Sequence, residues 1–76
     1  MPTAYVLILL DYNYPDYETM SQLDKLSCVI EVNKVERPYD IVVKLSDNNV
    51  DTIKECIAKQ MTRINGIQST VTLMSE

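Results

Sequence analysis

The sequence predicts an α+β fold with one small sheet and two helices, because six patterned segments follow one another within 76 residues. Four segments have the length and the β-branched, aliphatic composition of strands, and two repeat apolar residues at helical spacing. Their order is strand, helix, strand, strand, helix, strand. This order is typical of the ferredoxin-like βαββαβ arrangement, in which two helices cover one face of a four-stranded antiparallel sheet.

The first half of the chain holds the first two strands and one helix. Residues 4–10 form a continuous apolar run, which predicts a strand covered on both faces. A turn is expected over residues 11–13, and Pro15 suits the first position of a helix. The apolar residues of that helix recur at three-residue steps: Tyr17, Met20, Leu23 and Leu26. Residues 28–35 are rich in β-branched side chains and predict the second strand.

The second half repeats the pattern. Residues 40–45 predict a third strand, with Ile41, Val43 and Leu45 on one face and Val42 and Lys44 on the other. Asn48 suits the N-cap of a second helix, and Asp51 takes the capping-box position. The apolar stripe of this helix comprises Val50, Ile53, Cys56, Ile57, Met61 and Ile64.

Asn65 and Gly66 are expected to close that helix, and residues 67–74 to form the last strand. Alternation along this strand places Ile67, Val71 and Leu73 on one face and Gln68, Thr70 and Thr72 on the other.

The first strand predicts self-association. Tyr5, Leu7 and Leu9 alternate with Val6, Ile8 and Leu10, so the strand is apolar on both faces. Two helices cover only one face, and Ile30, Val32 and Val42, or the residues that alternate with them, are expected to extend the uncovered apolar surface. We therefore expect a homodimer that pairs sheet faces. The alternative is that Tyr and Lys side chains, or a loop, shield this face within one chain.

Composition excludes several classes of function. The chain contains no histidine, two cysteines and one glycine, so we expect no metal site, no phosphate-binding loop and no cofactor. Cys28 and Cys56 are expected to be buried thiols. The net charge of −4 gives no basic footprint for direct nucleic-acid binding. No signal peptide or membrane span is recognisable, and a cytoplasmic protein is expected.

Four anchors carry a resemblance to a known family: residues 4–8, residues 29–35, the segment Tyr39-Asp40-Ile41-Val42-Val43-Lys44, and Gly66-Ile67 leading to Ser69-Thr70-Val71-Thr72. Their order and spacing resemble the C-terminal effector-binding domain of the Lrp/AsnC family of feast-or-famine regulators. The resemblance spans nearly the whole chain, so residues 1–76 are expected to form one such ligand-binding domain without a helix-turn-helix domain.

The resemblance implies dimers with a barrel-like α/β body, higher rings of eight or ten chains, and a small effector such as an amino acid bound between dimers. The implied ligand-binding residues are Arg37, Tyr39, Asp40, Gly66, Ile67, Gln68 and Thr70. Arg37 and Pro38 replace the glycine and polar residue usual in the family's turn. Asp40 equally fits a turn cap or an ion pair with Arg37 or Lys34, and Tyr39 a packed aromatic side chain.

We expect a sensing and oligomerisation module that modulates transcription through partner regulators, with full-length members of the family as candidates, and not an enzyme. Catalytic residues are not expected, because no nucleophile stands beside a base. Cofactorless monooxygenases share the barrel and are not distinguished by pattern alone. ACT domains have the same element order but usually carry glycine after the first strand, where this chain has Asp11-Tyr12-Asn13. The alternative function is an assembly-only protein that joins full-length regulators without binding an effector.

Overall fold

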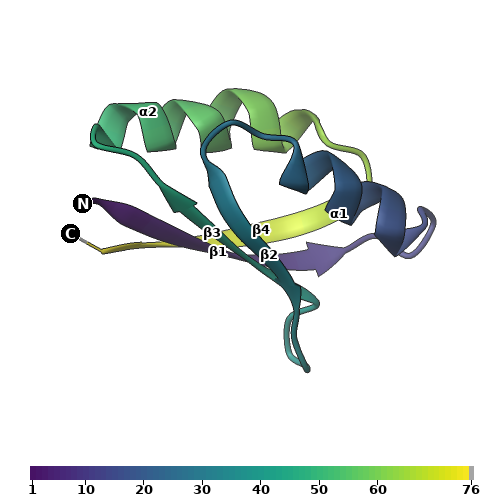
Figure 1. Cartoon of the computed structure of the whole chain (residues 1–76). Helices are drawn as coiled ribbons and strands as arrows, with labels where there is room; N and C mark the ends of the chain where they lie inside the picture. The colour runs from purple at the N-terminus through teal and green to yellow at the C-terminus, as the bar shows by residue number, and fades with distance from the viewer. Residues whose placement is uncertain (76) are drawn as a thin grey trace.

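A computed structural model describes residues 1–75. Its four strands are β1 (Thr3–Leu10), β2 (Val29–Lys34), β3 (Ile41–Ser46) and β4 (Ile67–Ser75), and its helices are α1 (Asp16–Asp24) and α2 (Val50–Glu55). The sheet is antiparallel with the order β2-β3-β1-β4. Both helices lie on one face of the sheet, and the two termini lie at the same end (Figure 1). The predicted ferredoxin-like fold is confirmed.

The core lies between the helices and the sheet, as the alternation in β1 and β3 predicts. Val6 and Ile8 of β1 and Ile41 and Val43 of β3 have no exposed surface, whereas Leu7 and Val42 face the other side of the sheet. Together the core residues are Ala4, Val6, Ile8, Leu10, Leu23, Cys28, Ile41, Val43, Leu45, Ile53, Cys56, Met61 and Ile64.

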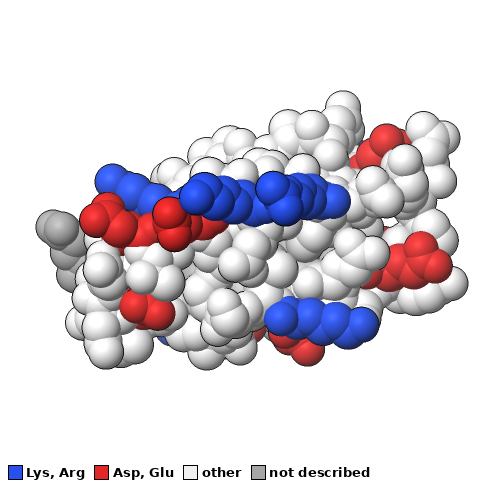
Figure 2. Space-filling model, turned by 90° about the horizontal axis from the view of Figure 1, so that it is seen from above, with Lys and Arg blue, Asp and Glu red and all other residues white. Residues whose placement is uncertain are grey.

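The second helical segment differs from the single helix expected. Its N-cap is Asn49, not Asn48, and the Asn49 side chain accepts a hydrogen bond from the Asp51 N–H. α2 then widens into one π-helical turn over Cys56–Gln60 and tightens into a 3₁₀ turn over Met61–Arg63. On the helix-covered side, basic and acidic side chains lie next to one another (Figure 2), and Lys59 pairs with Glu55 at 3.3 Å.

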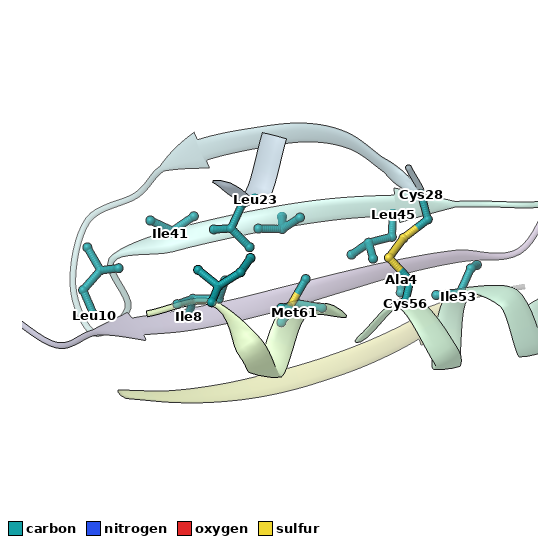
Figure 3. Close-up of a cluster of buried hydrophobic side chains, with 13 residues drawn as sticks. Ala4, Ile8, Leu10, Leu23, Cys28, Ile41, Leu45, Ile53, Cys56 and Met61 are labelled. Carbon is teal, nitrogen blue, oxygen red and sulfur yellow. A yellow bond between two sulfur atoms is a disulfide. The ribbon is translucent and has the colours of Figure 1, made fainter. Parts of the chain in front are cut away.

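The two cysteines form a disulfide, so the expectation of free buried thiols is wrong. Cys28 ends the turn after α1, Cys56 begins the π-helical turn, and their Cα atoms are 6.7 Å apart (Figure 3). Both residues belong to the core, as expected. The bond joins the α1–β2 half of the chain to the segment that leads into β4.

Two bulges shift side chains relative to simple alternation. In β4, Leu9 pairs with Ser69 and Leu10 with Ile67, which leaves Gln68 as the extra residue. Ile67 therefore packs against the core, and only Val71 and Leu73 of the predicted face point away from the helices.

A similar irregularity at Ile30 follows Val29 in β2. Val32 consequently pairs with Val43 and packs against the core, so its expected position on the uncovered face is wrong.

In α1 the buried positions are Thr19 and Leu23, whereas Tyr17 is 69% exposed and does not belong to a buried stripe. Thr19 is buried because its hydroxyl donates to the Asn65 carbonyl at 3.0 Å. None of the helices within residues 1–75 is long and apolar enough to cross a bilayer.

Candidate functional site

The candidate site lies where β1 ends between β3 and β4. Asp40 precedes β3 and Gly66 precedes β4, so the strand order places them on opposite sides of the last residues of β1. The Asp40 carboxylate accepts from the Leu10 N–H at 2.8 Å, and the Gly66 carbonyl accepts from the Asp11 N–H at 2.8 Å. Two predicted site residues therefore hold consecutive amides of the chain.

Asp40 is bonded through both of its carboxylate oxygens. Oδ2 accepts from Leu10 and Oδ1 accepts from the Tyr12 hydroxyl, each at 2.8 Å. These bonds, with the more distant positive charge of Arg37, hold the pKa of Asp40 below its ordinary value. The bond to Asp40 also raises the pKa of Tyr12.

The ion pairs considered for Asp40 do not form among residues 1–75. Lys34 instead contacts Asp16 at 2.7 Å. The Asp40 carboxylate does not cap its own turn either, because its oxygens accept from Leu10 of β1 and from Tyr12 in the turn after β1.

Gly66 is buried and has a φ of 95°. A Cβ atom there would collide with Thr19 Oγ1 and would lie 3.2 Å from the Cβ of Tyr14. Glycine is required for the backbone conformation and for the close approach of α1. These packing constraints account for Gly66 without any ligand.

Two hollows adjoin the bulge in β4. One, of about 420 Å³, is lined by Leu10, Asp11, Tyr12, Asn13 and Gln68. The other, of about 210 Å³, is lined by Ile57, Met61, Thr62, Ile67, Gln68, Ser69 and Thr70. Gln68 belongs to both because it is the extra residue of the bulge. The predicted residues Ile67, Gln68 and Thr70 are thus brought together.

Arg37 and Tyr39 stand apart from these hollows. Arg37 is exposed in the turn between β2 and β3, where the Arg37–Pro38 peptide bond is cis, and Tyr39 is half-buried. Neither residue lines either hollow among the residues that the structure describes. Asp40 does not line them either, because its carboxylate is bonded to Leu10 and Tyr12.

Neither Tyr12 nor Asp11 is among the ligand-binding residues that the resemblance implies. Tyr12 contacts Asp40 across 28 positions of sequence, and Asp11 bonds to Gly66. The only signal in the sequence is their place directly after a strand end, where side chains from neighbouring strands meet. Within residues 1–75 no three potential metal ligands cluster.

No protein-family model matches the sequence. An uncharacterised HTH-type transcriptional regulator from Pyrococcus furiosus is 32% identical over 78 residues, which cover 96% of this chain and 50% of that protein. Escherichia coli AsnC is 25% identical with a TM-score of 0.82, over 97% of this chain and 50% of AsnC. The chain is an Lrp/AsnC-type domain.

Solved structures of similar length also match this Lrp/AsnC-type domain. TTHA0845 from Thermus thermophilus is 28% identical with a TM-score of 0.88, over all of this chain and 94% of that chain. FFRP-DM1 is 25% identical with a TM-score of 0.88, over all of both chains. By contrast, the domain spans about half the length of the curated Pyrococcus relative. The curated Pyrococcus relative is described as a transcriptional regulator, and none of these four relatives is described as an enzyme.

Proposed function

We propose that this domain senses an amino acid or related zwitterion, assembles with itself, and modulates transcription through partner regulators. The observation that carries the proposal is the fixed Asp40 carboxylate at the end of β1, beside a hollow that contains Gln68. A zwitterion requires an acceptor for its ammonium and donors for its carboxylate, and this end of the sheet offers both.

Asp40 is the proposed partner of the ammonium group. The carboxylate is ionised at neutral pH, and its lowered pKa keeps it ionised in more acidic solution. The Gln68 amide and the Thr70 hydroxyl are proposed donors for the ligand carboxylate, with Ile67 in the adjacent wall and Gly66, which lines neither hollow, directly before it. Gln68 is well suited to this role because the bulge exposes it toward both hollows.

Arg37 and Tyr39 are proposed to act from a neighbouring copy. They lie on or beside the exposed turn between β2 and β3, away from the hollows of their own chain. A ligand held between dimers would bring the turn of one copy to the hollow of another. The planar guanidinium of Arg37 would then bind the ligand carboxylate through two parallel hydrogen bonds.

The open face of the sheet supports a homodimer. Tyr5, Val71 and Leu73 are 39%, 42% and 53% exposed on this face, and Leu7 extends it from Val71 to Val42 on the neighbouring strand β3. The Lys44 ammonium lies 5.9 Å from the Tyr5 ring and shields part of it, but the apolar residues of β4 remain exposed. Burial of this surface against a second copy removes it from water. Rings of eight or ten chains are proposed to form from such dimers.

A regulator from Neisseria meningitidis was solved in complex with L-methionine. It has a TM-score of 0.84 and is 9% identical, so it shows the same fold alone, over 99% of this chain and 49% of that chain. Its ligand supports an amino acid as the class of effector to test first.

Partner regulators would supply the contact with DNA. The net charge is −4, and acidic side chains accompany the basic ones on the helix-covered side (Figure 2), so direct nucleic-acid binding is disfavoured. Full-length regulators of the same family are the proposed partners in the cytoplasm. The second candidate function is assembly without an effector, which is favoured by the replacement of the family's turn glycine with Arg37 and Pro38.

Thermal unfolding against the twenty amino acids at millimolar concentration tests the proposal, after refolding to remove any carried ligand. A ligand at a hundred times its Kd adds about 2.7 kcal/mol of stability. In a domain of this size that is a rise in Tm of roughly ten degrees. Asp40→Asn should abolish the shift because the amide keeps the shape but loses the charge.

The matched control is Glu36→Gln, which makes the same change of charge on an exposed side chain in the turn before Asp40. It should retain the selective shift. A flat scan for the folded wild-type protein would favour the assembly-only function and contradict amino-acid sensing.

A further inference from the structure

Tyr12 links the two parts of the candidate site. Its hydroxyl donates to Asp40 Oδ1 at 2.8 Å, and its side chain also lines the hollow that contains Gln68. The residue is 72% exposed, which is unusual for a tyrosine whose hydroxyl holds a specific partner 28 positions away.

The two bonds to Asp40 differ in how firmly their donors are held. The Leu10 N–H belongs to β1, and Leu10 is 6% exposed, so this donor is fixed by the sheet. The Tyr12 hydroxyl comes from the turn after β1, at the end of an exposed side chain. A competing donor would therefore displace Tyr12 and leave the bond to Leu10 intact.

Tyr12, like Leu10, both bonds to Asp40 and lines the hollow. Asp40 does not line the hollow among the described residues, whereas Tyr12 contacts Asp40 and forms part of the hollow's wall. A zwitterion placed beside Gln68 would therefore lie next to the Tyr12 side chain, whose hydroxyl is bonded to the Asp40 carboxylate.

We propose that Tyr12 is a gate, which rests on the proposed amino-acid sensing: its hydroxyl occupies Asp40 in the free protein and is displaced by the ammonium group of the ligand. A protonated amine is a stronger partner for a carboxylate than a neutral phenol is. Ligands that carry an ammonium group open the gate, and the corresponding acids without an amino group do not. Tyr12 is accordingly a determinant of specificity for amino acids.

The test compares Tyr12→Phe with the wild-type protein in the thermal scan and in calorimetric titrations of the amino acids that shift Tm. Phenylalanine keeps the ring and removes only the hydroxyl. The variant should bind amino acids roughly two- to tenfold more tightly, the range expected for relief of one hydrogen bond. Tyr17→Phe is the matched control, because Tyr17 is 69% exposed and makes no hydroxyl bond among residues 1–75. It should leave the affinity unchanged.

The second part of the test uses a ligand without the amino group. The carboxylic acid that corresponds to the tightest amino acid should show no gain from Tyr12→Phe, because it does not compete for Asp40. Protein with ¹³C-labelled tyrosine adds a spectroscopic readout: the Tyr12 ring signal should move on amino-acid binding, and the raised pKa of Tyr12 should fall toward its ordinary value.

The outcomes separate the two proposals. Amino-acid binding that is equal or weaker in Tyr12→Phe would overturn the gate and leave amino-acid sensing intact. A gain that is equally large for the acid without an amino group would also overturn it. Absence of any shift in both proteins would overturn amino-acid sensing itself, and the gate with it.

Discussion

Asp40 extends the pairing of β1 with β3 through its side chain: the carboxylate accepts the Leu10 N–H at 2.8 Å. The regular register of these strands ends at the pair Ile8 and Ile41, and the Asp40 N–H donates to the Ile8 carbonyl at 2.9 Å. One residue thus continues the ladder with its backbone and then with its carboxylate. The carboxylate that is proposed to bind the ligand therefore also makes a structural contact with β1.

This contact predicts a difference between two substitutions. Asp40→Ala removes the acceptor of the Leu10 N–H and should lower Tm by several degrees, because Leu10 is buried and its amide then lacks a partner. Asp40→Asn retains a carbonyl oxygen at the same place and should lower Tm less. Calorimetric unfolding of both variants checks the order. Equal losses would show that the bond to Leu10 contributes little.

The same carboxylate predicts how stability depends on pH. The folded-state pKa of Asp40 is lowered, first by the Leu10 N–H and then by the Tyr12 hydroxyl. Its contribution is therefore present above the unfolded pKa of about 3.9 and is lost as pH falls through the lower folded value. Urea unfolding between pH 7 and pH 2 should show this loss, and Asp40→Asn should make the acid limb shallower. Identical acid limbs would contradict the assignment.

The disulfide predicts a large effect of reduction. Cys28 and Cys56 are 28 positions apart, and closing a loop of this size stabilises the folded state by about 3.5 kcal/mol in the chain-entropy description. The double variant Cys28→Ala, Cys56→Ala should unfold at correspondingly lower urea concentration. The control is the same variant with a reducing agent, which should cause no further change.

Mass spectrometry after alkylation in denaturant tests the bond directly. The non-reduced protein should take up no alkyl group, because both thiols are joined. Modification of both cysteines without reduction would contradict the disulfide.

Gly66 predicts a strongly destabilising substitution. Gly66→Ala places a methyl group against Thr19 Oγ1 and forces alanine into a φ of 95°. The expected loss is about 2 kcal/mol, within the range of backbone strain of this kind. Thr19→Ala removes the colliding oxygen, so the double variant should lose less stability than the sum of the two single variants. If the losses in free energy of unfolding, measured in urea, were additive, the collision with Thr19 would not be the cause of the destabilisation.

The open sheet face predicts a change of oligomeric state. Leu73→Lys places a charge on the exposed apolar face of β4 and should convert the proposed dimer into a monomer of 8.7 kDa. Thr72→Lys is the matched control, since Thr72 is the adjacent residue and pairs with Val6, whose side chain faces the helices. Sedimentation at several concentrations distinguishes them. A wild-type protein that remains monomeric would contradict the dimer.

Periodicity was sufficient for the elements and for most of the core. The alternation in β1 and β3 predicts which residues the helices cover, because regular strands keep strict period two. Alternation predicts the wrong face where a bulge adds one residue to a strand. The bulge at Gln68 moves Ile67 to the core side, and the irregularity at Ile30 does the same for Val32. Alternation alone does not mark such a shift.

Contacts between distant parts of the chain also could not be predicted from the sequence. The burial of Thr19 depends on the Asn65 carbonyl, and the disulfide depends on the approach of the π-helical turn to the start of β2. For the site, the resemblance supplied Asp40 and Gln68, which the fold places at the same end of the sheet. The partners of Asp40, Tyr12 and Leu10, could be identified only from the three-dimensional structure.

The pairing of Thr3 with Ser75 has a consequence for how this domain is joined to other chains. The first and last strands lie side by side, so both termini emerge at one end of the sheet (Figure 1). Leu10 and Asp40 are at the opposite end, about 25 Å away at the rise of a strand. A fluorophore, tag or additional domain can therefore be attached at either terminus without covering the site.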